Sequence, residues 1–182
     1  MNINLSKKFH TIFKIKLNPK NKLYQNFDNY IPKEWQSIII NDGSFTQNLN
    51  SLFINPTKIT MSQKYSIIFP EKLINIRNVW LENDSNNKVT FAKSIWIINK
   101  DYCKYNKIFN TIPIGYSLIN FEVDIYKNLQ EIFCGYCYDL EKRLQSKEII
   151  WGRKYQIFYP NQSSVTIEEY FTPKLVKVFT FI

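Results

Sequence analysis

The chain has little of several residue types on which catalytic sites often depend. Its 182 residues include one histidine, four glycines and three arginines. There is no glycine-rich phosphate loop and no nucleophilic serine in a strand-to-helix turn, and His10 is not placed for a catalytic triad. The sequence therefore gives no support to nucleotide hydrolysis or to serine or cysteine hydrolysis. We expect His10 to lie at the surface.

Cysteine is also scarce, with Cys103, Cys134 and Cys137 in the whole chain. Three cysteines do not make a disulfide framework and fit a reducing compartment. Cys134 and Cys137 have the C-x-x-C spacing of redox and zinc sites, but they lie in a strand-like run, where positions three apart face opposite sides. A four-ligand zinc site would need Cys103 and a carboxylate as well. We therefore predict no metal.

The chain lacks a continuous apolar run of ~20 residues, the length that a membrane-spanning helix requires. Residues 1–22 carry six lysines and no acid, but they have neither the apolar core of a secretory signal nor an arginine. We expect a soluble monomer with no membrane partner. Residues 1–32 are interpreted as an amino-terminal extension, followed by a domain at 33–176.

The net charge is +9, which would normally suggest nucleic acid as a partner. Here 21 lysines occur with 27 isoleucines, 21 asparagines and a single alanine, the composition that AT-rich codons produce. The lysines are also spread along the chain instead of gathering in one stripe. We do not predict a nucleic-acid partner, although a basic RNA-associated protein remains an alternative because lysines and aromatics alternate at 100–105.

Hydrophobic residues make up 45% of the chain, which predicts one folded domain with a substantial core. Turn and capping signals predict two short helices, one at 34–40 after Pro32 and one that starts at Ser44 or Thr46 and ends before Pro56. Alternation of period two predicts an antiparallel sheet of about six strands, so the fold class is α+β. The expected strands lie at 58–69, 73–82, 88–98, 129–140, 151–159 and 164–171, with a weaker run at 9–17, a hairpin loop at 83–87, a turn at 160–163 and short helical pieces around 114–118.

Arg77 lies inside an apolar strand-like run. A period of two puts it on one face with Val79 and Leu81, where a guanidinium loses its water. Such a buried cation requires an anion or several acceptors. The partner is either another side chain, in a structural ion pair, or the carboxylate of a ligand.

The final strand supplies a candidate acid. In 164–171, Glu169 shares a face with Val165, Ile167 and Phe171, whereas Glu168 lies on the polar face. A core-facing carboxyl is expected to have a raised pKa unless a cation compensates it. Arg77 and Glu169 together suggest a buried polar cavity or a structural ion pair. Arg153, in another strand, is interpreted as exposed, with a second anion contact as the alternative.

Six blocks of sequence, in order from Trp35 to Pro173, resemble the chorismate lyases, most of all the chorismate pyruvate-lyase-like proteins of red-algal plastids and cyanobacteria. Three of the four glycines, the only alanine and two of the three arginines lie in these blocks. The blocks are Asp42-Gly43-Ser44-Phe45-Thr46, Arg77-Asn78-Val79-Trp80-Leu81, Ala92-Lys93-Ser94, Pro113-Ile114-Gly115-Tyr116-Ser117-Leu118, Trp151-Gly152-Arg153 and Glu169-Tyr170-Phe171-Thr172-Pro173.

The resemblance implies an antiparallel sheet with helices packed on it and a small buried ligand pocket. It also implies removal of pyruvate from chorismate, a dicarboxylate, to give 4-hydroxybenzoate without metal or organic cofactor. Arg77 matches the family's carboxylate-binding arginine and Glu169 its active-site glutamate. Phe45 and Ile114 match positions that contact the ligand through their backbone.

The sequence departs from the family pattern at Phe45, where a leucine or methionine is expected, and at Lys93, where arginine is common. The same fold also serves as a ligand-sensing domain in bacterial transcription regulators, so a non-catalytic binder of small aromatic acids is the main alternative. The AT-rich composition and the lack of a transit peptide suit a plastid-encoded protein of the stroma. An AT-rich bacterium, with the protein in its cytoplasm, would give the same pattern.

Overall fold

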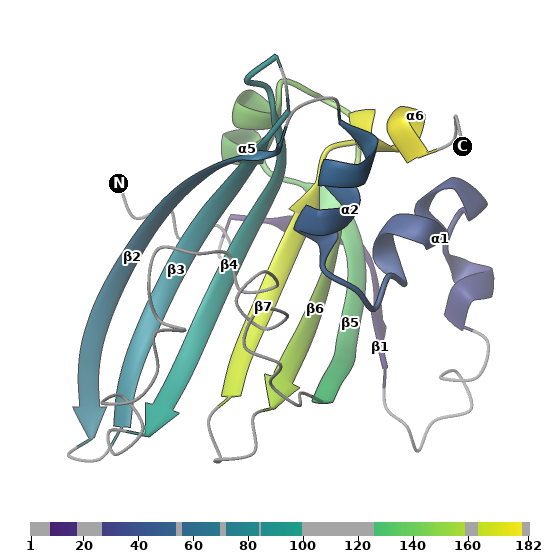
Figure 1. Ribbon diagram of the computed structural model, residues 1–182. Helices are drawn as coiled ribbons and strands as arrows, with labels where there is room; N and C mark the ends of the chain where they lie inside the picture. Colours follow the sequence, from purple (N-terminus) through teal and green to yellow (C-terminus); the bar gives the residue numbers. More distant parts are fainter. Residues whose placement is uncertain are drawn as a thin grey trace.

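The computed structural model describes residues 8–17, 27–53, 56–69, 72–83, 85–99, 126–158 and 164–179. Seven strands form one antiparallel sheet in the order β1-β5-β6-β7-β4-β3-β2 (Figure 1). The α+β class with a single antiparallel sheet is therefore confirmed, with seven strands instead of about six. The strands are β1 (His10–Lys16), β2 (Lys58–Phe69), β3 (Lys72–Glu82), β4 (Lys88–Asn99), β5 (Tyr126–Tyr136), β6 (Ile150–Phe158) and β7 (Ser164–Phe171).

The two helices expected after Pro32 are present as α1 (Lys33–Ile39) and α2 (Phe45–Leu52). Pro32 occupies the N-cap position of α1 and Ser44 that of α2, although neither side chain makes a capping hydrogen bond. A short 3-10 helix, η3 (Phe27–Tyr30), precedes α1. The chain also contains α5 (Tyr138–Leu144) and α6 (Lys174–Phe179), which the sequence analysis missed.

The missed helix α5 corrects the expected strand at 129–140. The strand β5 ends at Tyr136, and Cys137 starts a helix whose Glu141 accepts a hydrogen bond from the Cys137 backbone N–H at 3.1 Å. Leu140 and Leu144 lie four residues apart and are both buried, which is the period of a helix and not of a strand. The expected strand ran four residues too far because the residues after Tyr136 continue the alternating pattern of β5, although the chain there turns from strand to helix.

The hairpin loop between β3 and β4 is where the sequence placed it. The side-chain oxygen of Asn83 accepts hydrogen bonds from the backbone N–H groups of Ser85, at 3.1 Å, and Asn87, at 2.9 Å. Asn86 adopts a φ of 57°, in the left-handed region that asparagine tolerates better than most residues. The expected features at 114–118 and 160–163 lie outside the described residues.

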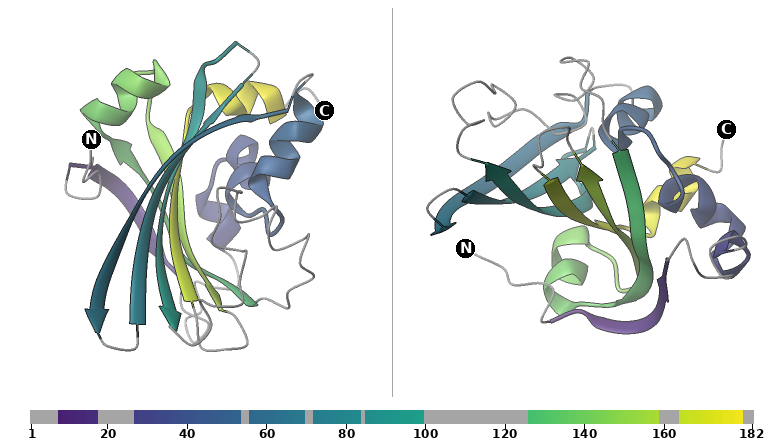
Figure 2. Two further views of the ribbon diagram at one scale, coloured as in Figure 1. Left: turned by 60° about the vertical axis from the view of Figure 1, so that its left-hand side comes forward. Right: turned by 90° about the horizontal axis from the view of Figure 1, so that it is seen from below.

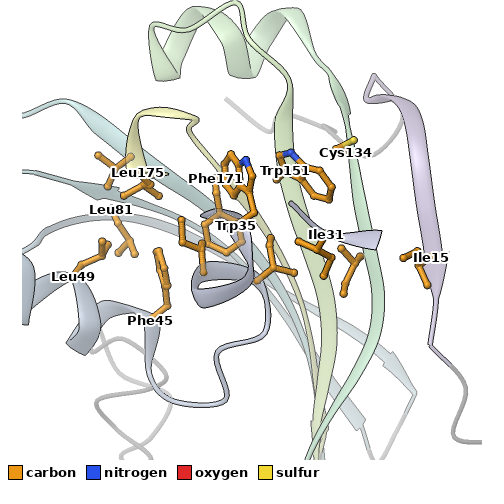
Figure 3. Close-up of a cluster of buried hydrophobic side chains, with 14 of the residues drawn as sticks. Ile15, Ile31, Trp35, Phe45, Leu49, Leu81, Cys134, Trp151, Phe171 and Leu175 are labelled. Carbon is orange, nitrogen blue, oxygen red and sulfur yellow. The ribbon is translucent and has the colours of Figure 1, made fainter. Parts of the chain in front are cut away.

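Helices cover both faces of the sheet, and Figure 2 shows α1, α2 and α6 on one side and α5 on the other. We call these the inner and the outer face. On the inner face, Trp35 of α1 packs near Trp151 and Phe171 of the sheet, as Figure 3 shows. On the outer face, Leu140 and Leu144 of α5 pack in a separate cluster with sheet residues. In the part of the chain that is described, no helix has the length and apolar character needed to cross a membrane.

Candidate ligand-binding site

A band of polar and charged side chains crosses the inner face between two apolar clusters. Strand alternation and register place it there: Arg77 on β3 lies opposite Ser94 on β4, and Glu169 on β7 lies opposite Arg153 on β6. The cluster that includes Trp35 and Phe171 lies on one side of the band, and the cluster that includes Trp96 and Val165 lies on the other. Arg77, Arg153 and Glu169 are 1%, 1% and 7% exposed. The sheet therefore holds three ionisable groups away from bulk water.

Glu169 faces inward, as the alternation of its strand predicted, but its cation is Arg153 and not Arg77. The Arg153 Nε donates to Glu169 Oε2 at 2.7 Å. The Tyr155 hydroxyl donates to the other carboxylate oxygen at 3.0 Å. Both oxygens of Glu169 are thus held by donors from the neighbouring strand, which fixes the direction of the carboxylate.

Arg153 is buried, so its interpretation as an exposed strand arginine is wrong. Its Nη1 donates to the backbone oxygens of Ile38, Ile39 and Asn41, at 3.3, 3.0 and 2.7 Å. These carbonyls lie at the carboxyl end of α1, where unsatisfied acceptors and the helix dipole both favour a cation. Burial is the largest single influence and lowers the pKa of Arg153, but Glu169, Tyr155 and Asp42 together raise it by more, so that the net shift is upward. One side chain therefore links the acid to a helix end.

Arg77 is buried, as its apolar neighbours predicted, and its guanidinium carbon lies 5.0 Å from the centre of the Trp96 ring. Trp96 Nε1 in turn donates to the Ser94 hydroxyl at 3.0 Å. Arg77 and Glu169 are separated by two strand spacings and two residues along the strands, which corresponds to about 12 Å between Cα atoms in a flat sheet.

Asn75 is a further polar group on this face, two residues before Arg77. It is fully buried, and neither atom of its side-chain amide has a hydrogen-bond partner among the described residues. A buried amide of this kind costs about 1–3 kcal/mol unless water or a ligand meets it. Alternation puts Asn75 on the same face as Arg77, so a signal existed in the sequence, but asparagine is too frequent in this chain to stand out.

Lys127 is the second residue that the sequence analysis missed. Its Nζ donates to the backbone oxygen of Asn41 at 2.8 Å and lies 4.7 Å from the centre of the Tyr155 ring. Burial and then the nearby Arg153 lower the pKa of Lys127 to about 8. Among 21 lysines, no local pattern distinguishes it, because its position depends on the pairing of β5 with β6.

The other two predicted site residues have different outcomes. Phe45 is the first residue of α2, and its side chain belongs to the core: its ring centre lies 4.9 Å from that of Phe171 and 6.1 Å from that of Phe179. The contact of its backbone with a ligand stays a prediction. Ile114 lies outside the described residues.

The two cysteines of the C-x-x-C motif belong to opposite faces, as expected from their spacing. Cys134 lies in the inner cluster and Cys137 in the outer one. Burial raises the pKa of the Cys134 thiol. Within the described ranges, no three His, Cys, Asp or Glu side chains are grouped in a way that could hold a metal ion. His10 is exposed, as predicted.

The fold and the band define a class: an α+β protein whose single antiparallel sheet carries buried arginines and a buried glutamate on its helix-covered inner face. A family described as "Chorismate pyruvate-lyase Rv2949c-like" matches residues 39–179. The chain belongs to this family, which confirms the resemblance that its sequence blocks indicated.

The similarity to known proteins covers most or all of the chain. A protein of Antithamnion sp. named "Uncharacterized protein ycf21" is 46% identical over 181 residues, which are 100% of this chain and 99% of the relative. Proteins of the same name from Porphyra purpurea and Cyanophora paradoxa are 36% and 29% identical, covering 85% and 81% of this chain and 88% and 81% of their own. A solved structure of a Staphylococcus aureus gene product has a TM-score of 0.54 at 12% identity, covering 75% of this chain and 92% of that one. This structural likeness concerns the fold alone.

Proposed function

We propose that the protein is a chorismate lyase that eliminates pyruvate from chorismate to give 4-hydroxybenzoate. The observation that carries the proposal is the placement of Arg77 and Glu169 on one buried face of the sheet, in a chain of the chorismate pyruvate-lyase family. Arg77 recognises a carboxylate of the substrate, because a guanidinium makes two parallel hydrogen bonds to such a group. Charge-assisted bonds of this kind contribute about 1.5–3 kcal/mol each.

The reaction needs little chemistry from the protein. The ring loses the proton on its hydroxyl-bearing carbon, while the bond from the adjacent ring carbon to the enolpyruvyl oxygen breaks and the ring becomes aromatic. The proton passes to the departing enolpyruvate, which becomes pyruvate, so that no net proton is gained or lost. The protein holds the ring, disperses the charge on the departing oxygen and excludes water. Arg77 faces the developing negative charge. Glu169 accepts a hydrogen bond from the ring hydroxyl, since each carboxylate oxygen has a second lone pair beyond the one used by Arg153 or Tyr155.

Two missed residues fit the same ligand. The side-chain amide of Asn75, which has no hydrogen-bond partner among the described residues, offers a donor and an acceptor two residues from Arg77. Lys127 adds a cation on the other side of the band, near Tyr155 and the end of α1. A substrate with two carboxylates separated by a ring suits two cationic positions at a distance better than a monocarboxylate does.

The test is direct. Purified protein is incubated with chorismate, and 4-hydroxybenzoate and pyruvate are followed, with Arg77→Gln and Glu169→Gln beside the wild type. We expect each variant to lose at least 100-fold in kcat/KM, because each removes a charge that acts on the transition state. Lys147→Gln, at an exposed position, is the matched control for charge and should change the rate by less than twofold. Equal turnover by Arg77→Gln and wild type would remove the proposed site.

A second candidate is a non-catalytic binder of small aromatic acids. It is favoured by one observation: both oxygens of Glu169 are already held by side chains of β6, which is also how a purely structural acid is arranged. The same experiment separates the two. Calorimetric binding of 4-hydroxybenzoate that Arg77→Gln abolishes, without turnover of chorismate by the wild type, would identify a binder. Retention on RNA with a steep salt dependence would instead support a basic RNA-associated protein.

We also propose the plastid stroma as the compartment. The support is the AT-rich composition of the chain together with its likeness to the ycf21 proteins of Antithamnion, Porphyra and Cyanophora. Fractionation of the source cells, with an antibody raised against the chain, would place it with stromal markers or with cytosolic ones.

A further inference from the structure

We propose a second binding site on the outer face of the sheet, which takes the phosphate group of a small phosphomonoester. A cleft of about 270 Å³ lies there between the β2–β4 hairpins and α5. Its lining includes Thr60, Ser62, Asn78, Trp80, Lys88 and Arg143. None of these residues belongs to the band on the inner face, so this site is separate from the one proposed for chorismate.

Two cationic side chains of this cleft, Arg143 and Lys88, lie against the ring of Trp80. The guanidinium carbon of Arg143 lies 5.6 Å from the centre of the Trp80 ring, and Lys88 Nζ lies 5.8 Å from the same centre. Contact with an aromatic ring fixes a guanidinium plane while its N–H edge remains available to an anion. The position of Arg143 is set by α5, since its neighbours Leu140 and Leu144 bury themselves against Trp80 and Phe91.

The charges in the cleft do not cancel. Lys88 pairs with Glu82 at 3.3 Å, and that carboxylate also accepts the Thr60 hydroxyl at 3.4 Å. Arg143 takes part in no ion pair with a described residue. The two acids of α5 are engaged elsewhere, Asp139 with Lys8 and Glu141 at the start of the helix. One positive charge in the cleft is therefore left for an external anion.

The remaining polar groups suit the oxygens of a phosphate. The side-chain oxygen of Asn78 is buried and has no hydrogen-bond partner within the described ranges. A half-turn of this side-chain amide would present its NH₂ group, a donor, to a phosphate oxygen. The Ser62 hydroxyl lies at the next position across the sheet, opposite Asn78. A dianionic phosphate has three oxygens for these donors and a bidentate match to Arg143, whereas a carboxylate has two oxygens and a single charge.

The size of the cleft favours a small ester over a bare ion. About 270 Å³ is near the lower end of small-molecule pockets, ~300–1,000 Å³. This holds a phosphate and a body of several carbon atoms, which would lie along the apolar atoms of Met61, Trp80 and Phe91.

Phenyl phosphate titrated into the full chain, followed by calorimetry, tests the site. We expect saturable 1:1 binding that Arg143→Gln weakens at least tenfold and that Ser62→Ala, on an exposed position of an edge strand, weakens about threefold. Lys142→Gln removes the same charge from the adjacent exposed position of α5 and should change the affinity by less than twofold. Arg77→Gln should leave the binding unchanged, which separates this site from the inner one.

Four results would overturn the proposal. Equal weakening by Arg143→Gln and Lys142→Gln would mean diffuse attraction by a basic protein. Inorganic phosphate that binds as tightly as phenyl phosphate would mean an adventitious ion only. Phenylacetate that binds as tightly would remove the preference for phosphate, and an absence of saturable binding to the wild type would remove the site. Far-UV circular dichroism of each variant confirms that the loss of binding does not reflect unfolding.

Discussion

The buried ion pair between Arg153 and Glu169 allows a sharp prediction of stability. Glu169→Gln keeps the length of the side chain and one acceptor oxygen but removes the charge that faces Arg153. Removal of one partner from a buried pair costs about 3–5 kcal/mol, and because the amide still accepts one hydrogen bond we expect about 3 kcal/mol. With a urea dependence of about 2 kcal/mol/M for a domain of this size, the unfolding midpoint should fall by about 1.5 M.

Arg153→Met should cost more, about 4–5 kcal/mol, because it also leaves three backbone oxygens at the end of α1 without their donor. The double variant should lose about 2 kcal/mol less free energy of unfolding than the two single variants lose together, because the second substitution removes a charge that the first has already left unpaired. Urea unfolding followed by tryptophan fluorescence measures all three.

The chain supplies a matched control on the same two strands. Lys154 and Glu168 lie one position away, on the outer face, at 3.8 Å and with partly exposed side chains. Exposed pairs contribute about 0–1 kcal/mol, so Glu168→Gln should shift the midpoint by less than about 0.5 M in urea. Equal shifts for Glu168→Gln and Glu169→Gln, or strictly additive effects in the Arg153 and Glu169 cycle, would refute the reasoning.

Two further predictions concern stability. The pKa of Lys127 is about 8 in the folded chain against 10.5 for an unperturbed lysine, so between these values the unfolded chain binds more protons than the folded one. The free energy of unfolding of the wild type should therefore rise with pH from 8 to 10, and Lys127→Met should remove this rise. Urea midpoints at pH 7, 8, 9 and 10 measure both proteins, and parallel curves for the two would contradict the prediction. Gly152→Ala places a Cβ 2.6 Å from the backbone oxygen of Glu169 and should destabilise by about 1–3 kcal/mol, whereas Gly43→Ala, whose nearest neighbour would lie at 3.4 Å, should be close to neutral by the same urea assay.

The elements of the fold were largely predictable because they depend on local patterns. The alternation in 58–69, 73–82 and 88–98 and the polar stretch between the last two are enough for a meander of antiparallel strands. The helix α5 was missed because residues 129–140 keep alternating while the chain changes from strand to helix at Cys137. The helix α6 was missed although Thr172 and Pro173 precede it, a start signal like Pro32 before α1, because its six residues are too few to show a helical period.

The burial of two candidate site residues was predictable from the sequence, but the pairing of the buried charges was not. The alternation of β7 correctly turned Glu169 inward, and the apolar neighbours of Arg77 correctly predicted its burial. The assignment of Arg153 to the surface failed because burial of a strand position depends on what covers that face. Here the carboxyl end of α1, more than a hundred residues earlier in the chain, meets its guanidinium.

The sequence by itself determined which side of each strand its charged residues occupy, since alternate side chains of a strand must point to opposite faces. It also carried enough ordered blocks to indicate the family. Only the tertiary structure decided which charges meet. The strand order β6-β7-β4-β3 puts Arg153 directly beside Glu169 and leaves Arg77 two strands away. The strand order depends on the packing of segments that lie far apart in the sequence, and a local pattern of residues carries no information about that packing.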